Sequence, residues 1–261
     1  RWRFIYLPDL TVPAELPIEM TAFKSQQFRW AKGSIQTFLK IKGSILKANI
    51  PLNVKVEAFF HIGANFAYAL MTVMTVLMPV ILIIRFNNGY KKLLYLDVPI
   101  FICATLSVFC FYFYTEYAVI KETLSVKNRS LTKPLIFLPF VVSIGIGLCI
   151  NNTKAVLEAL IRKQSPFNRT PKYNVSDDGD NSMSARMKNV LGNVYRTRKI
   201  DAVSIIELLL AVYMSYAVYF TYANDLYLSL PLILMFQVGF FYTSLLSIVH
   251  TPISIFFNKK S

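Results

Sequence analysis

"IGANFAYALMTVMTVLMPVILII", residues 62–84, is a run of 23 side chains without a single charge. About 20 consecutive apolar residues are enough for a helix to cross the ~30 Å hydrocarbon core of a bilayer. Four more charge-free windows follow, at 98–115, 134–153, 208–224 and 226–249. In a chain of 261 residues of which 55% are hydrophobic, these windows predict a membrane protein and not a soluble globule.

The positive charge lies between the apolar windows. The chain has a net charge of +14, and the positive-inside rule and anionic lipid headgroups account for basic loops of this kind, so nucleic acid is not an expected partner. Nine Lys and Arg residues lie in 1–61 and ten lie in 154–201. Both segments share the cytoplasmic side if the window 134–153 does not cross. We therefore predict four spans, with 134–163 as an interfacial amphipathic helix, and a fifth span through 134–153 as the alternative.

A short motif precedes the first window. The stretch "SQQFRWAKGSIQTFLKIKGS", residues 25–44, contains Gln26, Arg29 and Trp30 in the pattern Gln-x-x-Arg-Trp. In isolation, Trp30 suits a headgroup anchor and Arg29 suits a lipid phosphate. The context favours a function, because a strand-like segment precedes the motif and the largest basic loop contains "FNRTPK", residues 167–172.

With these two motifs in this order, the chain resembles the processive family-2 glycosyltransferases, the membrane-embedded synthases of cellulose, chitin, hyaluronan and β-mannans. In that family a QxxRW motif lies on an interfacial helix beneath the channel entrance, and cellulose synthases carry an FxVTxK gating loop before the next span. The first motif is matched fully here. The second is matched at Phe167, Thr170 and Lys172, and differs at Arg169, where the pattern has valine.

The resemblance implies roles for the motif residues. Arg29 would bind the diphosphate of a sugar donor with help from Gln26, because a guanidinium binds such a group bidentately and an ammonium does not. Trp30 would be the platform for the terminal acceptor sugar, since its indole has a flat apolar face and an N–H at the rim. In the gating-like loop, Thr170 and Lys172 would reach the donor phosphates while the loop's aromatic side chain covers the donor.

The resemblance also implies a fold. We expect a mainly α structure of about four membrane helices plus interfacial amphipathic helices, preceded by the tail of an α/β nucleotide-sugar-binding domain that is otherwise absent, because the chain begins inside that domain. The predicted segments are the end of that domain (1–20), the interfacial motif region (21–57), two membrane helices (58–120), a cytoplasmic segment (121–199) with the interfacial helix (134–163) and the gating-like loop (165–175), two more membrane helices (200–250), and a cytoplasmic tail (251–261).

The catalytic groups of this family are expected upstream of the chain. A general base and an Asp-x-Asp site for Mg²⁺ or Mn²⁺ belong to the full-length enzyme, so this chain alone is predicted to bind no metal and to be inactive. The acidic run 177–180, "DDGD", lies in a polar loop and is interpreted as solvated charge. His61 and His250 lack sequence partners for catalysis, and Glu15 and Glu19 are predicted to be surface residues.

A polar stripe on the first span suggests a channel. Its members recur at spacings of 4, 3, 4 and 3, which places them on one helix face that must contact protein or a wet cavity. Ordinary helix packing through hydroxyl groups explains the stripe equally well. Glu207 also needs a partner or the interface, because a carboxylate in a span costs about 2.5–3.5 kcal/mol. The stripe consists of His61, Asn65, Tyr68, Thr72 and Thr75.

The sequence thus predicts the membrane half of a processive, inverting β-glycosyltransferase, with both basic segments on the cytoplasmic side of a plasma or inner membrane. Its partners would be a UDP- or GDP-sugar, the growing glycan and the lipid bilayer. One alternative is a non-processive enzyme that adds a sugar to a lipid or short acceptor. The other is a transporter or scaffold subunit without catalysis.

Overall fold

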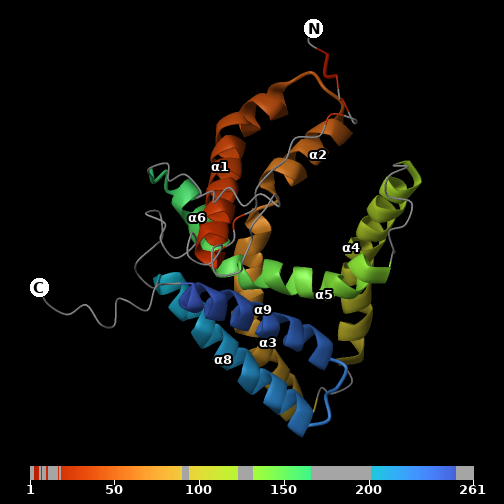
Figure 1. Cartoon of the computed structure of the whole chain (residues 1–261), viewed down its shortest axis with the longest axis vertical. Helices are drawn as coiled ribbons and strands as arrows, with labels where there is room; N and C mark the ends of the chain where they lie inside the picture. The colour runs from red at the N-terminus through yellow and green to blue at the C-terminus, as the bar shows by residue number, and fades with distance from the viewer. Residues whose placement is uncertain are drawn as a thin grey trace, which may run out of the picture.

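The computed structural model describes residues 3–5, 7, 10, 17, 19–89, 94–122, 132–165 and 201–250. These residues form helices and no strands, so the predicted mainly α fold is confirmed (Figure 1). The helices are α1 (Met20–Lys47), α2 (Leu52–Gly63), α3 (Phe66–Asn87), α4 (Leu94–Glu122), α5 (Thr132–Gly147), α6 (Cys149–Leu160), α8 (Ala202–Ala223) and α9 (Leu230–Val249).

Among the described residues, three helices, α3, α8 and α9, are long and apolar enough to cross a membrane. They contain 22, 22 and 20 residues, which at 1.5 Å per residue gives a length of about 30 Å or slightly more. Counted as one bent span, the pair α5 and α6 also meets this requirement of length and hydropathy, which gives up to four candidate spans in the described part of the chain. The predicted second span lies in α4, whose described apolar stretch is the shorter Thr105–Thr115. The chain is therefore an integral membrane protein. The candidate that brings the number to four is the segment predicted to be interfacial, and not the predicted second span.

The predicted interfacial helix 134–163 is two helices, and they are bent by 44° relative to each other. α5 lies beside α9 and runs in the same direction across Figure 1. α6 turns away from α9 and packs against α1 and α3. The bend therefore brings one continuous apolar segment into contact with both a candidate span and the motif helix.

Glycine allows the backbones of α5 and α9 to touch. A Cβ atom placed on Gly239 would lie 2.1 Å from the carbonyl oxygen of Ser143, and one on Gly147 would lie 2.4 Å from the carbonyl oxygen of Gly239. No side chain fits at such distances, so both positions require glycine for this close approach. Beside the crossing, the rings of Phe140 and Tyr242 meet edge to face with centroids 4.9 Å apart.

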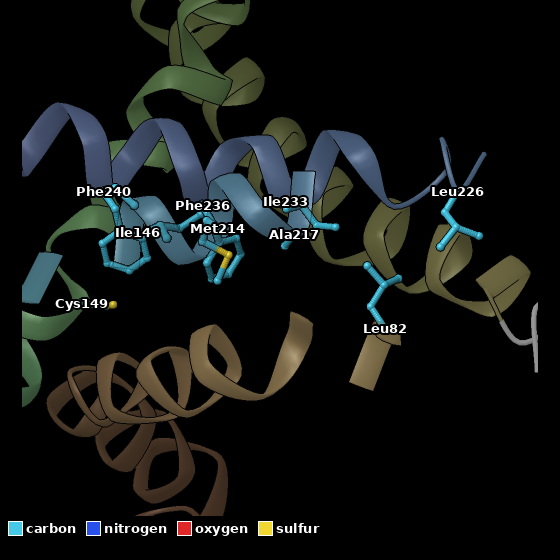
Figure 2. Packing of buried hydrophobic residues seen from close by; sticks show 10 residues of the cluster. Leu82, Ile146, Cys149, Met214, Ala217, Leu226, Ile233, Phe236 and Phe240 are labelled. Carbon is cyan, nitrogen blue, oxygen red and sulfur yellow. The ribbon is translucent and has the colours of Figure 1, made fainter. Parts of the chain in front are cut away.

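The main apolar core lies between α3, α8 and α9 and includes the junction of α5 and α6 (Figure 2). Phe240, Met214 and Ala211 are fully buried there. A second, smaller cluster joins α1 to α6 through Ile35, Val156 and Ala159. The remaining residues of the main core are Leu82, Ile146, Cys149, Ala217, Leu226, Ile233 and Phe236.

The polar stripe predicted on the first span is interrupted. His61 lies in α2 and is exposed, and the chain turns through Ala64 and Asn65 before α3 begins at Phe66. The spacing argument assumed one continuous helix from 61 to 75, which this break contradicts for His61. The other members of the stripe remain on α3 or at its first turn.

Candidate functional site

The motif helix α1 is fixed to the membrane helices along one face. Its buried residues include Lys24, Ala31 and Ile35. Their spacings of 7 and 4 residues place them on a single stripe of the helix. This stripe contacts α6 and, near its beginning, α8 and α9.

The three motif residues lie on the other side of α1. At about 100° per residue, Gln26, Arg29 and Trp30 are rotated by roughly 140–240° from Lys24. Gln26 and Arg29 are half-buried, and the indole of Trp30 is 62% exposed. Their spacing of three and four residues places them on neighbouring turns of one surface. The predicted motif thus forms a shared polar and aromatic surface that faces away from the helix bundle.

Lys24 forms a buried polar cluster that joins four helices. Its ammonium Nζ lies 2.8 Å from Glu207 Oε2 in α8, and it donates hydrogen bonds to Ser204 Oγ at 3.0 Å and Ser247 Oγ at 3.4 Å. The carbonyl oxygen of Lys24 accepts a hydrogen bond of 2.9 Å from Asn151 Nδ2 in α6. We call Lys24, Glu207, Ser204, Ser247 and Asn151 the Lys24 cluster.

Because Lys24 and Glu207 are both buried, each charge needs the other as its partner. Lys24 is 4% exposed and Glu207 is 0% exposed. Among the described residues, no second cation forms an ion pair with Glu207. Removing one member of a buried pair leaves an unpaired charge, which costs about 3–5 kcal/mol. The expectation that Glu207 needs a partner is confirmed, and the partner comes from the motif helix.

A second buried lysine, Lys32, joins α1 to α6. Its Nζ lies 2.8 Å from Glu158 Oε2 and also donates to the hydroxyl of Ser165, just beyond α6. The other oxygen of Glu158 lies 3.2 Å from Lys163 Nζ. Two cations therefore contact the two oxygens of this carboxylate.

We expect the Lys32 pair to contribute modestly to stability. Lys32→Met should lower the free energy of unfolding of the full-length protein by about 1 kcal/mol, because Glu158 keeps Lys163 and some access to water. The matched variant Lys163→Met should have little effect, since that side chain is 60% exposed. Thermal midpoints in detergent would measure both. Equal midpoints for the two variants would contradict the role given to Lys32.

The beginning of α1 is held by the end of α9. The backbone N–H of Met20 donates to His250 Nδ1 at 3.0 Å, which satisfies one of the free N–H groups of the first helical turn. The adjacent Glu19 is only 3% exposed, so its prediction as a surface residue is wrong. Burial follows because this helix end packs against another helix, which no local pattern in the sequence indicates. Glu15 lies outside the described residues.

The polar residues of α3 face protein. Thr72 Oγ1 lies 2.8 Å from Thr153 Oγ1 of α6, and the buried Thr75 donates to the carbonyl oxygen of Met71. Tyr68 packs against the main core. Thr72 also borders a cavity of about 270 Å³ between α3 and α6. These contacts show helix packing, and a channel-lining role for Asn65, Tyr68 and Thr72 stays a prediction.

Several predicted residues lie outside the part of the chain that the structure describes. They are the gating-loop residues Phe167, Arg169, Thr170 and Lys172 and the acidic run 177–180. Within the described residues, no three His, Cys, Asp or Glu side chains come together as a metal site. The donor-binding and gating roles of the loop therefore stay predictions.

Sequence reasoning missed the two buried lysines. In the sequence, Lys24 and Lys32 are part of a basic segment that suits lipid headgroups. Both lysines lie on the same side of α1 as Ala31 and Ile35, and this position was an available signal. A helix stripe that contains small and apolar residues packs against another part of the protein. The partners could not be paired from sequence, since Glu207 lies 183 residues away.

Comparisons with known proteins identify glucomannan 4-beta-mannosyltransferases among the relatives. Glucomannan 4-beta-mannosyltransferase 7 of Arabidopsis thaliana is 32% identical over 100 residues, which is 34% of this chain and 18% of the relative. Probable glucomannan 4-beta-mannosyltransferase 9 of Oryza sativa subsp. japonica is 33% identical over 100 residues, 34% of this chain and 19% of the relative. Probable glucomannan 4-beta-mannosyltransferase 7 of the same species is 47% identical over 47 residues, 18% of this chain and 8% of the relative.

The aligned part of the chain thus spans less than a fifth of the length of these relatives. No family model matches the chain. No solved structure matches it either. The resemblance predicted from the two motifs is nevertheless confirmed at the level of the relatives: over the stretches that align, this chain is similar to proteins named glucomannan 4-beta-mannosyltransferases.

Proposed function

We propose that this chain is the membrane part of a processive, inverting β-glycosyltransferase that polymerises a mannan from a nucleotide sugar and moves it across the membrane. The arrangement of α1 carries the proposal. One face of this helix is fixed to the membrane helices through Lys24, Lys32 and Ile35, and the opposite face presents the Gln-x-x-Arg-Trp residues. A catalytic domain packed over that face would meet these side chains at the membrane boundary.

The motif residues suit the chemistry of sugar transfer. When the sugar leaves its nucleotide, the diphosphate gains negative charge, and the guanidinium of Arg29 stabilises it through bidentate hydrogen bonds. Gln26, one turn earlier on the same surface, adds a neutral hydrogen bond. Trp30 stacks against the terminal sugar of the acceptor and holds its hydroxyl towards the donor. The chain contributes binding and orientation to the reaction.

The remaining catalytic parts are expected from the full-length protein. A general base and an Asp-x-Asp site for Mg²⁺ or Mn²⁺ belong to the nucleotide-sugar-binding domain that the family resemblance implies. Metal bound there would neutralise charge on the leaving diphosphate. The names of the relatives favour a mannosyl donor, so GDP-mannose is the proposed substrate. Both basic segments are proposed to face the cytoplasm, where nucleotide sugars are available.

The direct test is polymer synthesis by the full-length protein. Membranes containing it are incubated with labelled GDP-mannose, and in parallel with UDP-glucose and UDP-N-acetylglucosamine, and the product is sized. We expect long β-linked chains from GDP-mannose that an endo-β-mannanase degrades. Products of one or two added sugars would favour the non-processive alternative. No transfer from any donor in well-inserted protein would favour the transporter or scaffold alternative and contradict the proposal.

Arg29→Lys tests the diphosphate contact. Lysine keeps the positive charge but loses the bidentate geometry, so we expect the transfer rate to fall by about 10- to 100-fold, equivalent to roughly 1.5–3 kcal/mol. Initial rates should be compared at equal amounts of inserted protein. Lys42→Arg, at an exposed position on the same helix, is the matched control and should leave the rate unchanged. Equal rates for Arg29→Lys and the control would contradict the assignment of Arg29 to the donor site.

A further inference from the structure

The Lys24 cluster has no part in the chemistry described above, yet it is the most buried group of charges in the described part of the chain. Lys24 lies two residues before Gln26 and five before Arg29. Its ammonium contacts α8 and α9, and its carbonyl contacts α6. Each helix that meets the beginning of α1 therefore contacts this one residue by a directional bond.

Directional bonds constrain a helix in ways that apolar packing does not. The smaller apolar cluster of Ile35, Val156 and Ala159 holds α1 against α6 by close packing, but dispersion contacts have no donor–acceptor direction. Lys24 Nζ, by contrast, must reach Glu207 Oε2 at 2.8 Å and Ser204 Oγ at 3.0 Å together. Together with the 2.9 Å hydrogen bond from Asn151 Nδ2 to the carbonyl oxygen of Lys24, these distances narrow the rotation and height that α1 can adopt. Buried polar groups are known to specify register in this way.

We propose that Lys24 and Glu207 are positioning residues: their buried ion pair sets the rotation and height of the motif helix relative to α8 and α9, and so aligns Trp30 and Arg29 with the path of the glycan. This inference rests on the proposed function. The inference extends the proposed function from the residues that contact substrate to a pair of residues that acts through them. Without the pair, α1 keeps its apolar contacts, the Lys32–Glu158 ion pair and the hydrogen bond from Met20 to His250, but it loses the bonds that fix it against Glu207 and Ser204 of α8.

The experiment compares single and double variants of the full-length protein. Lys24→Met and Glu207→Met each leave one buried charge without a partner, so both should reduce the amount of folded, monodisperse protein. The double variant Lys24→Met/Glu207→Met leaves no buried charge, so its folded yield should recover to near the wild-type level. Lys40→Met, at an exposed lysine of α1, is the matched control and should behave as wild type in every assay.

The double variant separates positioning from stability. Per folded molecule, we expect its kcat to fall about tenfold and its products to be shorter, while KM for the nucleotide sugar stays within about twofold. Hydrogen exchange of the α1 amides around 20–30 should be about tenfold faster than in wild type, with α8 and α9 unchanged. A purely structural pair predicts normal kcat, normal product length and normal exchange once the fold has recovered.

The outcomes distinguish the inference from the function it rests on. Wild-type kinetics, product length and exchange in the folded double variant would overturn the positioning role and leave the proposed function intact. If the wild-type protein makes no glycan but the double variant still shows faster exchange in α1, the pair does set the helix position and the proposed function is wrong. Faster exchange with normal product length would also overturn the inference, because it would show that the position of α1 does not control the glycan.

Discussion

Long polymer should disappear when Trp30 is replaced with alanine in the full-length protein. The indole is 62% exposed on the face of α1 that points away from the bundle, so it is available to a ligand and contributes little to packing. Truncating a tryptophan at the centre of a binding site costs about 2–4 kcal/mol, or roughly 30- to 1,000-fold in affinity or rate. In a processive enzyme this loss recurs at every addition, so product length should collapse further than the initial rate.

The measurement is the size distribution of labelled product at equal amounts of inserted protein. Trp30→Phe, which keeps an aromatic face but loses the N–H, should retain most of the chain length. Folding is checked by the thermal midpoint, which should stay unchanged in both variants because the side chain is exposed. If Trp30→Ala still makes an undiminished amount of polymer, Trp30 is better explained as a lipid anchor than as the acceptor platform.

Alanine at Gly239 should severely destabilise the protein. Its Cβ would lie 2.1 Å from the carbonyl oxygen of Ser143 and 3.1 Å from the backbone nitrogen of Gly147, so α5 and α9 must move apart. Relief by a side-chain rotation is impossible because the clashing atoms are backbone. We expect a loss of about 3 kcal/mol or more, at the upper end of overpacking effects, together with lost contacts along the whole α5–α9 interface.

Gly145→Ala is the matched control for this prediction. It lies on α5 between Ser143 and Gly147, but a Cβ there would meet nothing within 4 Å. Alanine also favours a helix over glycine by about 1 kcal/mol, so this variant should be neutral or slightly more stable. Thermal midpoints and the fraction of protein that survives detergent extraction compare the two variants. Similar values would show that the helices do not cross as closely as described.

The motif and the spans were predictable because they depend on local patterns. A charge-free run of 23 residues predicts a membrane helix wherever its neighbours lie, and α3 covers most of that run. The spacing of Gln26, Arg29 and Trp30 likewise predicts one surface as soon as the segment is helical. The structure confirms the helix, and it adds that this surface points away from the bundle, which depends on the buried stripe on the other side.

The contacts that hold the motif helix were not predictable from sequence. Lys24 and Glu207 are 183 residues apart, and each has a plausible local explanation, as a headgroup contact and as an isolated membrane carboxylate. The bend between Gly147 and Cys149 was also missed, because composition alone describes 134–163 as one amphipathic segment. His61 was assigned to the first span since hydrophobicity does not report the short break after Gly63. Each error concerns how elements pack, which a single sequence does not specify.

The distance in sequence between α1 and its partners has a consequence for biosynthesis. Met20 is bound by His250, 230 residues later, and Lys24 is bound by Ser247, 223 residues later. At about 5–20 residues per second, a ribosome needs roughly 10–50 s to make the intervening chain. During that time the nascent protein carries a lysine whose carboxylate partner has not yet been translated or inserted. Until α9 is complete, α1 cannot form its contacts with His250 and Ser247, so a chain that terminates upstream of α9 lacks this part of the docking of α1.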